Sequence, residues 1–240
     1  MRGRTVNSSL SGEAYANVRH RILRGELKLG QVISRRTLAS ELGMSFLPVS
    51  EALLRLEVEG LLESRPRAGT RVRIPTPLDV EGHYVVREAL EMQAARLFSA
   101  NASAEQKAEL QTLASQLDAL TPGPDSDRAR YLTLHEKLHK QIAEYSGCGA
   151  LCEAIEQTHA LASTWMCVGG SSGHSPWRHR RLLEALVSGD ADQAAEAMRD
   201  HVRSSQQDAL SRLTPYFKLQ KARGARYARS NKPETADFAD

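Results

Sequence analysis

The sequence predicts a mainly α-helical protein in two parts, an N-terminal winged helix-turn-helix and a C-terminal all-helical antiparallel bundle. Three observations support this fold class. Two short helical patterns are separated by Gly43-Met44-Ser45, which is the spacing of a helix-turn-helix. Two short strand patterns, joined by a turn that contains Pro and Gly, follow directly. From residue 79 onward, apolar residues recur at intervals of three and four, with only short Gly, Pro and Ser breaks.

In the N-terminal part, residues 1–10 are expected to form a flexible arm and residues 11–74 the winged-helix domain. Ser11 and Ser34 are suitable N-caps for the first two helices, and Gly43 is a suitable stop for the second. We expect helices at about 12–24, 35–42 and 46–59, and strands at 61–65 and 70–74 with a turn over 66–69.

In the C-terminal part, residues 75–78 (Pro-Thr-Pro-Leu) form the expected linker and domain boundary. Residues 79–214 are expected to form the helical domain. Residues 215–240 are polar and basic with little apolar content, which predicts a disordered basic tail. The expected helices of this domain are about 79–100, 103–120, 126–146, 149–167, 175–188 and 190–213.

The charge is distributed unevenly along the chain. Residues 1–74 carry 13 Lys and Arg against 7 Asp and Glu, whereas residues 75–214 carry 13 against 19. A basic head on an acidic body indicates that the head meets a polyanion. The three cysteines form no CxxC pair and no even set, the N-terminus has no apolar signal segment, and no run approaches about 18 apolar residues. We therefore expect a cytoplasmic protein with no membrane partner.

The helix expected at 131–146 carries two histidines on its apolar face. His135 and His139 are four residues apart and share that face with Leu132, Leu138 and Ile142. This spacing stacks two imidazoles one turn apart, close enough to bind one metal ion. A histidine on an apolar face is also a common core residue, so both interpretations stay open for this helix by itself.

A second pair of histidines lies on the last two expected helices. His179 comes ten residues before Gly189, and His201 comes eleven residues after Asp190. If the two helices fold back antiparallel, both histidines lie about 15 Å from the turn at 1.5 Å per residue. Four imidazoles can then converge in one bundle, and neutral imidazole suits Zn, Ni, Cu or Fe. We interpret the remaining histidines as ordinary residues: His20, His83, His159 and His174.

The stretch ILRGELKLG…RRTLASELGMS…PVSEALLRLEVEGLLESRPRAGTRV resembles the DNA-binding domain of the GntR family of bacterial transcription regulators, over about residues 12–74. The resemblance implies that the third helix enters the major groove of double-stranded operator DNA and that the wing touches the adjacent minor groove. Phe46 and Ser50 stand where the family usually carries arginines that read guanine. Phe46 either contacts a thymine methyl group or packs within the domain. The expected DNA-binding residues are Arg35, Arg36, Ser45, Phe46, Ser50, Arg65, Arg67 and Gly69.

Residues of about 79–210 resemble the FadR-type branch of the same family, whose ligand-binding domain is the all-helical FCD domain. The matching pieces are REALE from Arg87, LHKQIA from Leu138, HRRLLEAL from His179 and MRDH ending at His201. Many members bind a divalent metal through one Asp and three His. Here His139, His179 and His201 match the histidine positions, and His135 stands at the usual Asp. The resemblance thus implies four neutral ligands, which favours Zn, with Ni as the alternative.

Arg87 matches a family position that lines the effector pocket, which makes it a candidate clamp for a small organic or sugar acid. Its other interpretation is a surface ion pair with Glu91, four residues on.

The function predicted from the sequence is a metabolite-responsive transcription regulator that binds DNA as a homodimer and is not an enzyme. One alternative is a regulator that senses the metal itself. A second is a four-histidine metalloenzyme, which would lack a carboxylate base because Glu136 points away from the histidine face.

Overall fold

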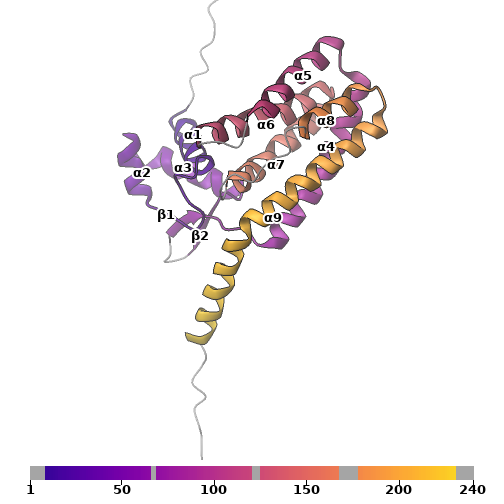
Figure 1. Ribbon diagram of the computed structural model, residues 1–240. Helices are drawn as coiled ribbons and strands as arrows, with labels where there is room; N and C mark the ends of the chain where they lie inside the picture. The colour runs from indigo at the N-terminus through magenta and orange to yellow at the C-terminus, as the bar shows by residue number, and fades with distance from the viewer. Residues whose placement is uncertain (1–8, 66–68, 121–124, 168–177, 231–240) are drawn as a thin grey trace, which may run out of the picture.

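The computed structural model describes residues 9–65, 69–120, 125–167 and 178–230. Figure 1 shows a small N-terminal domain beside a bundle of long helices, with the last helix extending past the junction of the two. The mainly α-helical fold class is confirmed: a winged helix-turn-helix precedes an all-helical domain. Among the described residues, no helix is long and apolar enough to cross a lipid bilayer.

The N-terminal domain is built of three helices and a three-stranded sheet. The helices are α1 (Leu10–Leu23), α2 (Arg35–Leu42) and α3 (Phe46–Val58). The antiparallel sheet has the strand order β1-β3-β2, from β1 (Val32–Ile33), β2 (Leu62–Arg65) and β3 (Gly69–Val72). Side chains from all three helices and the sheet fill one core, including Val18, Leu38, Leu53, Leu56 and Val72.

Local signals explain most of these boundaries. The Ser34 hydroxyl accepts a hydrogen bond from the Thr37 amide at 3.2 Å and caps α2, as expected. Gly43 ends α2 in the left-handed region with φ +63°. The first helix begins earlier than expected, because Ser9 and not Ser11 is its N-cap, so Leu10 of the predicted arm is already helical. Residues 1–8 of the predicted arm lie outside the described residues. Strand β1 was not predicted.

The helical domain contains α4 (Pro77–Asn101), α5 (Ala104–Ala119), α6 (Asp125–Tyr145), α7 (Gly149–Cys167), α8 (Arg178–Val187) and α9 (Ala191–Ser230). Helices α4 and α9 lie side by side along much of their length (Figure 1). The linker predicted over residues 75–78 is shorter, because Thr76 and Asp79 form a capping box that starts α4 at Pro77. The shared core includes Phe98, Leu110, Leu138, Leu186 and Leu213.

The prediction of a disordered tail from residue 215 is wrong as far as Ser230, because α9 continues through Pro215 to that residue. Tyr216 and Phe217 pack against the core of the helical domain. The Gln220 side chain donates a hydrogen bond to the Ile74 carbonyl at 2.8 Å, next to the domain boundary. These tertiary contacts outweigh the helix-breaking tendency of proline. Residues 231–240 of the predicted tail lie outside the described residues.

The two domains contact each other through α1, α6 and α7. Leu161 of α7 packs against the cores of both domains. It lies next to Gly60, where a Cβ atom would come within 3.6 Å of its methyl groups. Arg19 of α1 forms an ion pair with Glu136 of α6 at 2.9 Å. The helix that carries His135 and His139 is therefore joined directly to the N-terminal domain.

Replacing Phe217 by Ala is expected to lower the free energy of unfolding by about 1–3 kcal/mol, because a half-buried aromatic side chain leaves the core. Leu219→Ala is the matched control: Leu219 is 56% exposed, and its loss should change stability by less than about 0.5 kcal/mol. Urea unfolding of the full chain measures both values. Equal stability of the two variants would restore the prediction of a disordered tail.

Candidate metal centre and nucleic-acid interface

Three histidines from two helices bring their ring nitrogens together inside the helical domain. His135 and His139 lie on the inner face of α6, and their Nε2 atoms are 3.3 Å apart. His201 of α9 places its Nε2 atom 3.2 Å from that of His139. All three side chains are buried. The i, i+4 spacing thus has the geometric consequence expected from the sequence.

His179 of α8 joins the same cluster. Its ring centroid is 5.6 Å from that of His135 and 5.3 Å from that of His201. The α8–α9 hairpin therefore brings His179 and His201 to the same height, as the counting of residues from Gly189 predicted. The ring of His179 therefore lies beside the three histidines whose ligand atoms are all within 4.8 Å of one another, His135, His139 and His201.

Two carboxylates orient two of these rings from outside the cluster. The Nδ1 atom of His139 is 2.5 Å from Glu91 Oε2, and that of His179 is 2.7 Å from Asp118 Oδ1. A carboxylate at Nδ1 holds the proton there and leaves Nε2 as the lone-pair atom that faces inward. Asp118 also accepts from the backbone N–H of Arg180 at 3.0 Å, so one carboxylate caps α8 and orients His179. No pattern in the sequence indicated that Glu91 or Asp118 contacts a histidine.

The dimensions of the cluster fit a metal ion. Two nitrogens that share a tetrahedral zinc lie about 3.3 Å apart, because each Zn–N bond is about 2.0–2.1 Å. The Nε2 separations of 3.3 Å between His135 and His139 and of 3.2 Å between His139 and His201 match this value. Burial first, and then the neighbouring His139, His179 and His201, hold the pKa of His135 well below its usual range. The cluster therefore favours neutral imidazole, which is the form that ligates a metal.

A buried charge network lies against the cluster. Arg87 is fully buried, and its Nε atom donates to Glu91 Oε1 at 2.7 Å. The alternative interpretation of Arg87, a surface ion pair with Glu91, is wrong in its exposure, although Glu91 is the partner. The Nη1 atom of Arg87 has no hydrogen-bond partner among the described residues. Burial alone would raise the pKa of Glu91, but Arg87 and then His139 and His159 hold it well below its usual range. Glu91 is therefore an ionised carboxylate.

His159 of α7 also belongs to this network, so its interpretation as an ordinary histidine is wrong. Its Nε2 atom is 3.3 Å from Glu91 Oε1, and its ring centroid is 4.7 Å from that of His139. The sequence carried one signal for this position. Ile155 and Ala162, four residues before and three after, are buried and share its helix face. A fifth inward-facing histidine was therefore predictable as buried, but its carboxylate partner was not.

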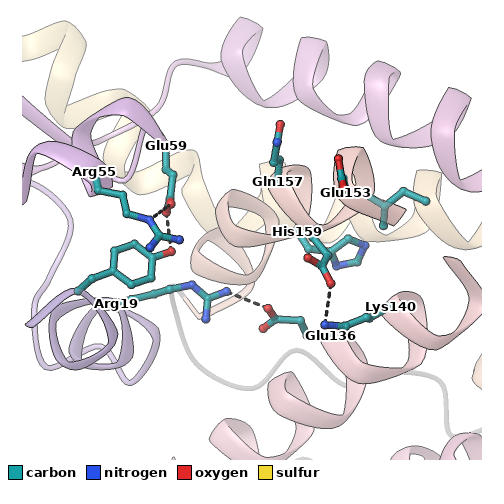
Figure 2. Close-up of a pocket in the computed structure, with 11 residues that line it drawn as sticks. Arg19, Arg55, Glu59, Glu136, Lys140, Glu153, Gln157 and His159 are labelled. Atoms are coloured by element: carbon teal, nitrogen blue, oxygen red, sulfur yellow. Dashed lines mark hydrogen bonds and ion pairs between the residues drawn. The ribbon is translucent and has the colours of Figure 1, made fainter. Parts of the chain in front are cut away.

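An interdomain cavity of about 510 Å³ lies on the other side of His159. Figure 2 shows its lining from α1, α3, α6 and α7, with the Arg19–Glu136 ion pair across it. The Tyr15 hydroxyl donates to Glu59 at 2.7 Å, and burial together with this carboxylate raises the pKa of Tyr15 to about 12. The cavity lies between the N-terminal domain, which contributes Tyr15 and Arg19, and His159 of the histidine network.

The predicted DNA-binding residues that the structure describes come from α2, α3 and the two wing strands, with Ser45 as the N-cap of α3. Arg36 and Ser45 are exposed at the first turns of α2 and α3, and Ser45 caps α3 without a side-chain hydrogen bond. Phe46 is 58% exposed, so more than half of its side chain does not pack within the domain, while Ser50 is half-buried. Arg35 donates to Thr70 Oγ1 at 3.3 Å. Of the wing residues, Arg65 is 58% exposed, Gly69 begins β3 with φ +76°, and Arg67 lies outside the described residues.

The buried histidines make stability depend on pH. Burial lowers the pKa of His139 to about 4, although Glu91 opposes this shift. The imidazole of the unfolded chain has a pKa near 6.5, so protonation favours the unfolded state. The stability that comes from keeping His139 neutral is complete above pH 6.5 and is lost as the pH falls toward about 4. His139 alone accounts for about 3 kcal/mol. Urea unfolding of the chelator-treated chain between pH 7.5 and 4.5 measures the slope. His139→Gln should reduce it and His20→Ala, at an exposed histidine, should not; equal slopes in all three proteins would contradict the assignment.

Comparison with known proteins identifies both domains. Residues 10–72 match the model of bacterial regulatory proteins of the gntR family, and residues 83–204 match that of the FCD domain. A probable D-xylose utilization operon transcriptional repressor from Paenarthrobacter nicotinovorans is 29% identical over 184 residues, 75% of this chain and 80% of that protein. The HTH-type transcriptional regulator McbR of Escherichia coli K12 is 30% identical over 155 residues, 65% of this chain and 69% of McbR.

The solved structure of E. coli McbR/YncC has the same fold, with a TM-score of 0.70 and 24% identity over 85% of this chain and 98% of that one. The names of the relatives are those of transcriptional regulators. The chain therefore belongs to the gntR family of bacterial regulatory proteins and is a transcriptional regulator, not an enzyme, with a DNA-binding helix-turn-helix and an FCD effector-binding domain.

Proposed function

We propose that this regulator acts as a homodimer on operator DNA, and that its FCD domain holds one divalent metal and a small carboxylate effector. The proposed metal is zinc, with nickel as the alternative, and its ligands are His135, His139, His179 and His201. The observation that carries the proposal is the meeting of the Nε2 atoms of His135, His139 and His201 at separations that suit one metal ion.

The effector class follows from charge. Four neutral ligands leave the positive charge of a divalent metal uncompensated in its first coordination shell, and a carboxylate effector offsets part of that charge. Arg87 lies in the adjacent network, and its buried Nη1 group supports a role in binding the same anion. The relative from P. nicotinovorans is named for a D-xylose utilization operon, so sugar acids are the first effector class to test.

The proposed dimer is supported by exposed apolar side chains on the helical domain. Leu78 and Val85 are 76% and 67% exposed, and seven residues apart they lie on one face of α4. A second copy of the chain that covers this face would remove them from water. Sedimentation of Leu78→Glu/Val85→Glu tests the interface, since it should dissociate a dimer that the unmodified chain forms.

Metal analysis of the purified full-length chain tests the metal centre. About one zinc or nickel per chain is expected, and His139→Ala and His201→Ala should each lose most of it. His20→Ala is the matched control because His20 is exposed and lies outside the cluster. Full metal content in both cluster variants would remove the proposed site. Metal that exchanges readily and changes DNA affinity would favour the alternative, a regulator that senses the metal itself.

Helix α6 links the proposed metal site to the DNA-binding domain. His135 and His139 occupy its inner face, and Glu136, between them in sequence, pairs with Arg19 of α1. A shift of α6 on ligand binding therefore moves the partner of Arg19.

Reversing one charge of this pair should weaken the coupling. In Arg19→Glu or Glu136→Arg, the metal content is expected to stay unchanged, while the change in DNA affinity on chelation shrinks about two- to five-fold, the range for a part-exposed ion pair. The double variant Arg19→Glu/Glu136→Arg restores the opposite charges and should recover the response. Single variants that respond to chelation like the unmodified chain would show that the pair is only a surface contact.

A further inference from the structure

The exposed face of the recognition helix α3 is apolar. Phe46 is 58% exposed and Leu47 is 67% exposed, both in the first turn, and Leu54, two turns on, is 60% exposed. Leu47, Ser50 and Leu54 are spaced by three and four residues, so with Phe46 they form one stripe along the helix. The opposite face, with Val49, Leu53 and Leu56, is buried in the domain core.

Folding of the domain does not explain why Phe46, Leu47 and Leu54 are large and apolar. They contribute little to the core because more than half of each remains in water. Large exposed apolar side chains in a row indicate a surface that a partner covers. The stripe carries no basic side chain: Arg55, the one arginine within α3, lies over the ring of Tyr15 at 3.9 Å and pairs with Glu59.

Charge identifies the partner as DNA. Arg36, exposed at the start of α2, and Arg65, exposed on the wing, belong to the same small domain as the stripe and suit phosphate oxygens. The N-terminal residues of a recognition helix contact base edges in the major groove. Phe46 and Leu47 hold that position in α3.

We propose that Phe46 and Leu47 select the operator by contact with the C5-methyl groups of thymine. The thymine methyl is the apolar group that the major groove presents, and aromatic and aliphatic side chains are its partners. Guanine is read by Arg or Lys, and the stripe has neither. Glu51, the exposed charged side chain beside the stripe, is an acceptor only and suits the amino groups of cytosine or adenine. The operator is therefore expected to carry thymine, not guanine, opposite the first turn of α3.

Removal of single methyl groups tests the proposal directly. The full-length chain first selects a binding sequence from a random duplex library. Each thymine of that sequence is then replaced by deoxyuridine, which differs only by the missing C5-methyl group. At one or two positions in each half-site, affinity should fall about four-fold, the factor that corresponds to the burial of one methyl group. Where thymine is replaced by cytosine, 5-methylcytosine should recover part of the loss.

Variants assign the effect to the stripe. Phe46→Ala/Leu47→Ala should bind thymine and uracil duplexes equally, and its fold should be unaffected because both residues are exposed. Arg36→Ala should weaken binding to both duplexes by the same factor, as a phosphate contact does. Val58→Ala, at an 82% exposed residue in the last turn of α3, should leave the discrimination unchanged.

Four results would overturn the proposal. The first is that no sequence is selected, and the second is that no uracil replacement changes affinity. The third is that the double variant keeps the preference for thymine. The fourth is that the double variant alters only the dimer dissociation constant, which would assign the stripe to a protein interface.

Discussion

The helical domain depends on one buried carboxylate. Glu91 is 1% exposed, and its two oxygens are shared by Arg87 of the same helix, His139 of α6 and His159 of α7. A buried charge without partners is very unfavourable, so the three helices must keep these groups in place for the domain to fold. The same carboxylate fixes the proton of His139 on Nδ1 and so determines which nitrogen faces the other histidines. Stability and ligand geometry therefore have a common origin at this residue.

Local features of the sequence were enough to predict the order of the elements and much of the histidine cluster. Ser34 and Gly43 bound α2 because caps act through neighbouring backbone groups. The meeting of His179 with His201 follows from the rise of a helix and a short turn. Strand β1 has only two residues and exists because β3 pairs with it, so no local pattern can reveal it. Asp118 and Glu91 reach their histidines from other helices, across contacts that helix periodicity does not encode.

Long-range contacts also explain why the predicted disordered tail is helical as far as Ser230. Its polar composition indicated an end to the ordered chain, and Pro215 inside α9 is a residue that weakens a helix. Phe217 and the bond from Gln220 to Ile74 nevertheless hold α9 together at the domain boundary. Composition indicates only the average tendency of a segment to be ordered or disordered. A few tertiary contacts, such as those of Phe217 and Gln220, are enough to hold the segment as a helix. The departures of this chain at Phe46 and Ser50 likewise acquired meaning only when the exposure of the stripe was known.

Helix α9 carries His201 near one end and Gln220 nineteen residues further along, which is a span of about 28 Å. A helix of this length acts as a lever arm. A tilt of about five degrees around His201 displaces Gln220 by about 2 Å, which is enough to break its 2.8 Å bond to Ile74. The chain leaves the DNA-binding domain at Ile74, so an angular change too small to disturb the packing of the bundle is magnified where the two domains join.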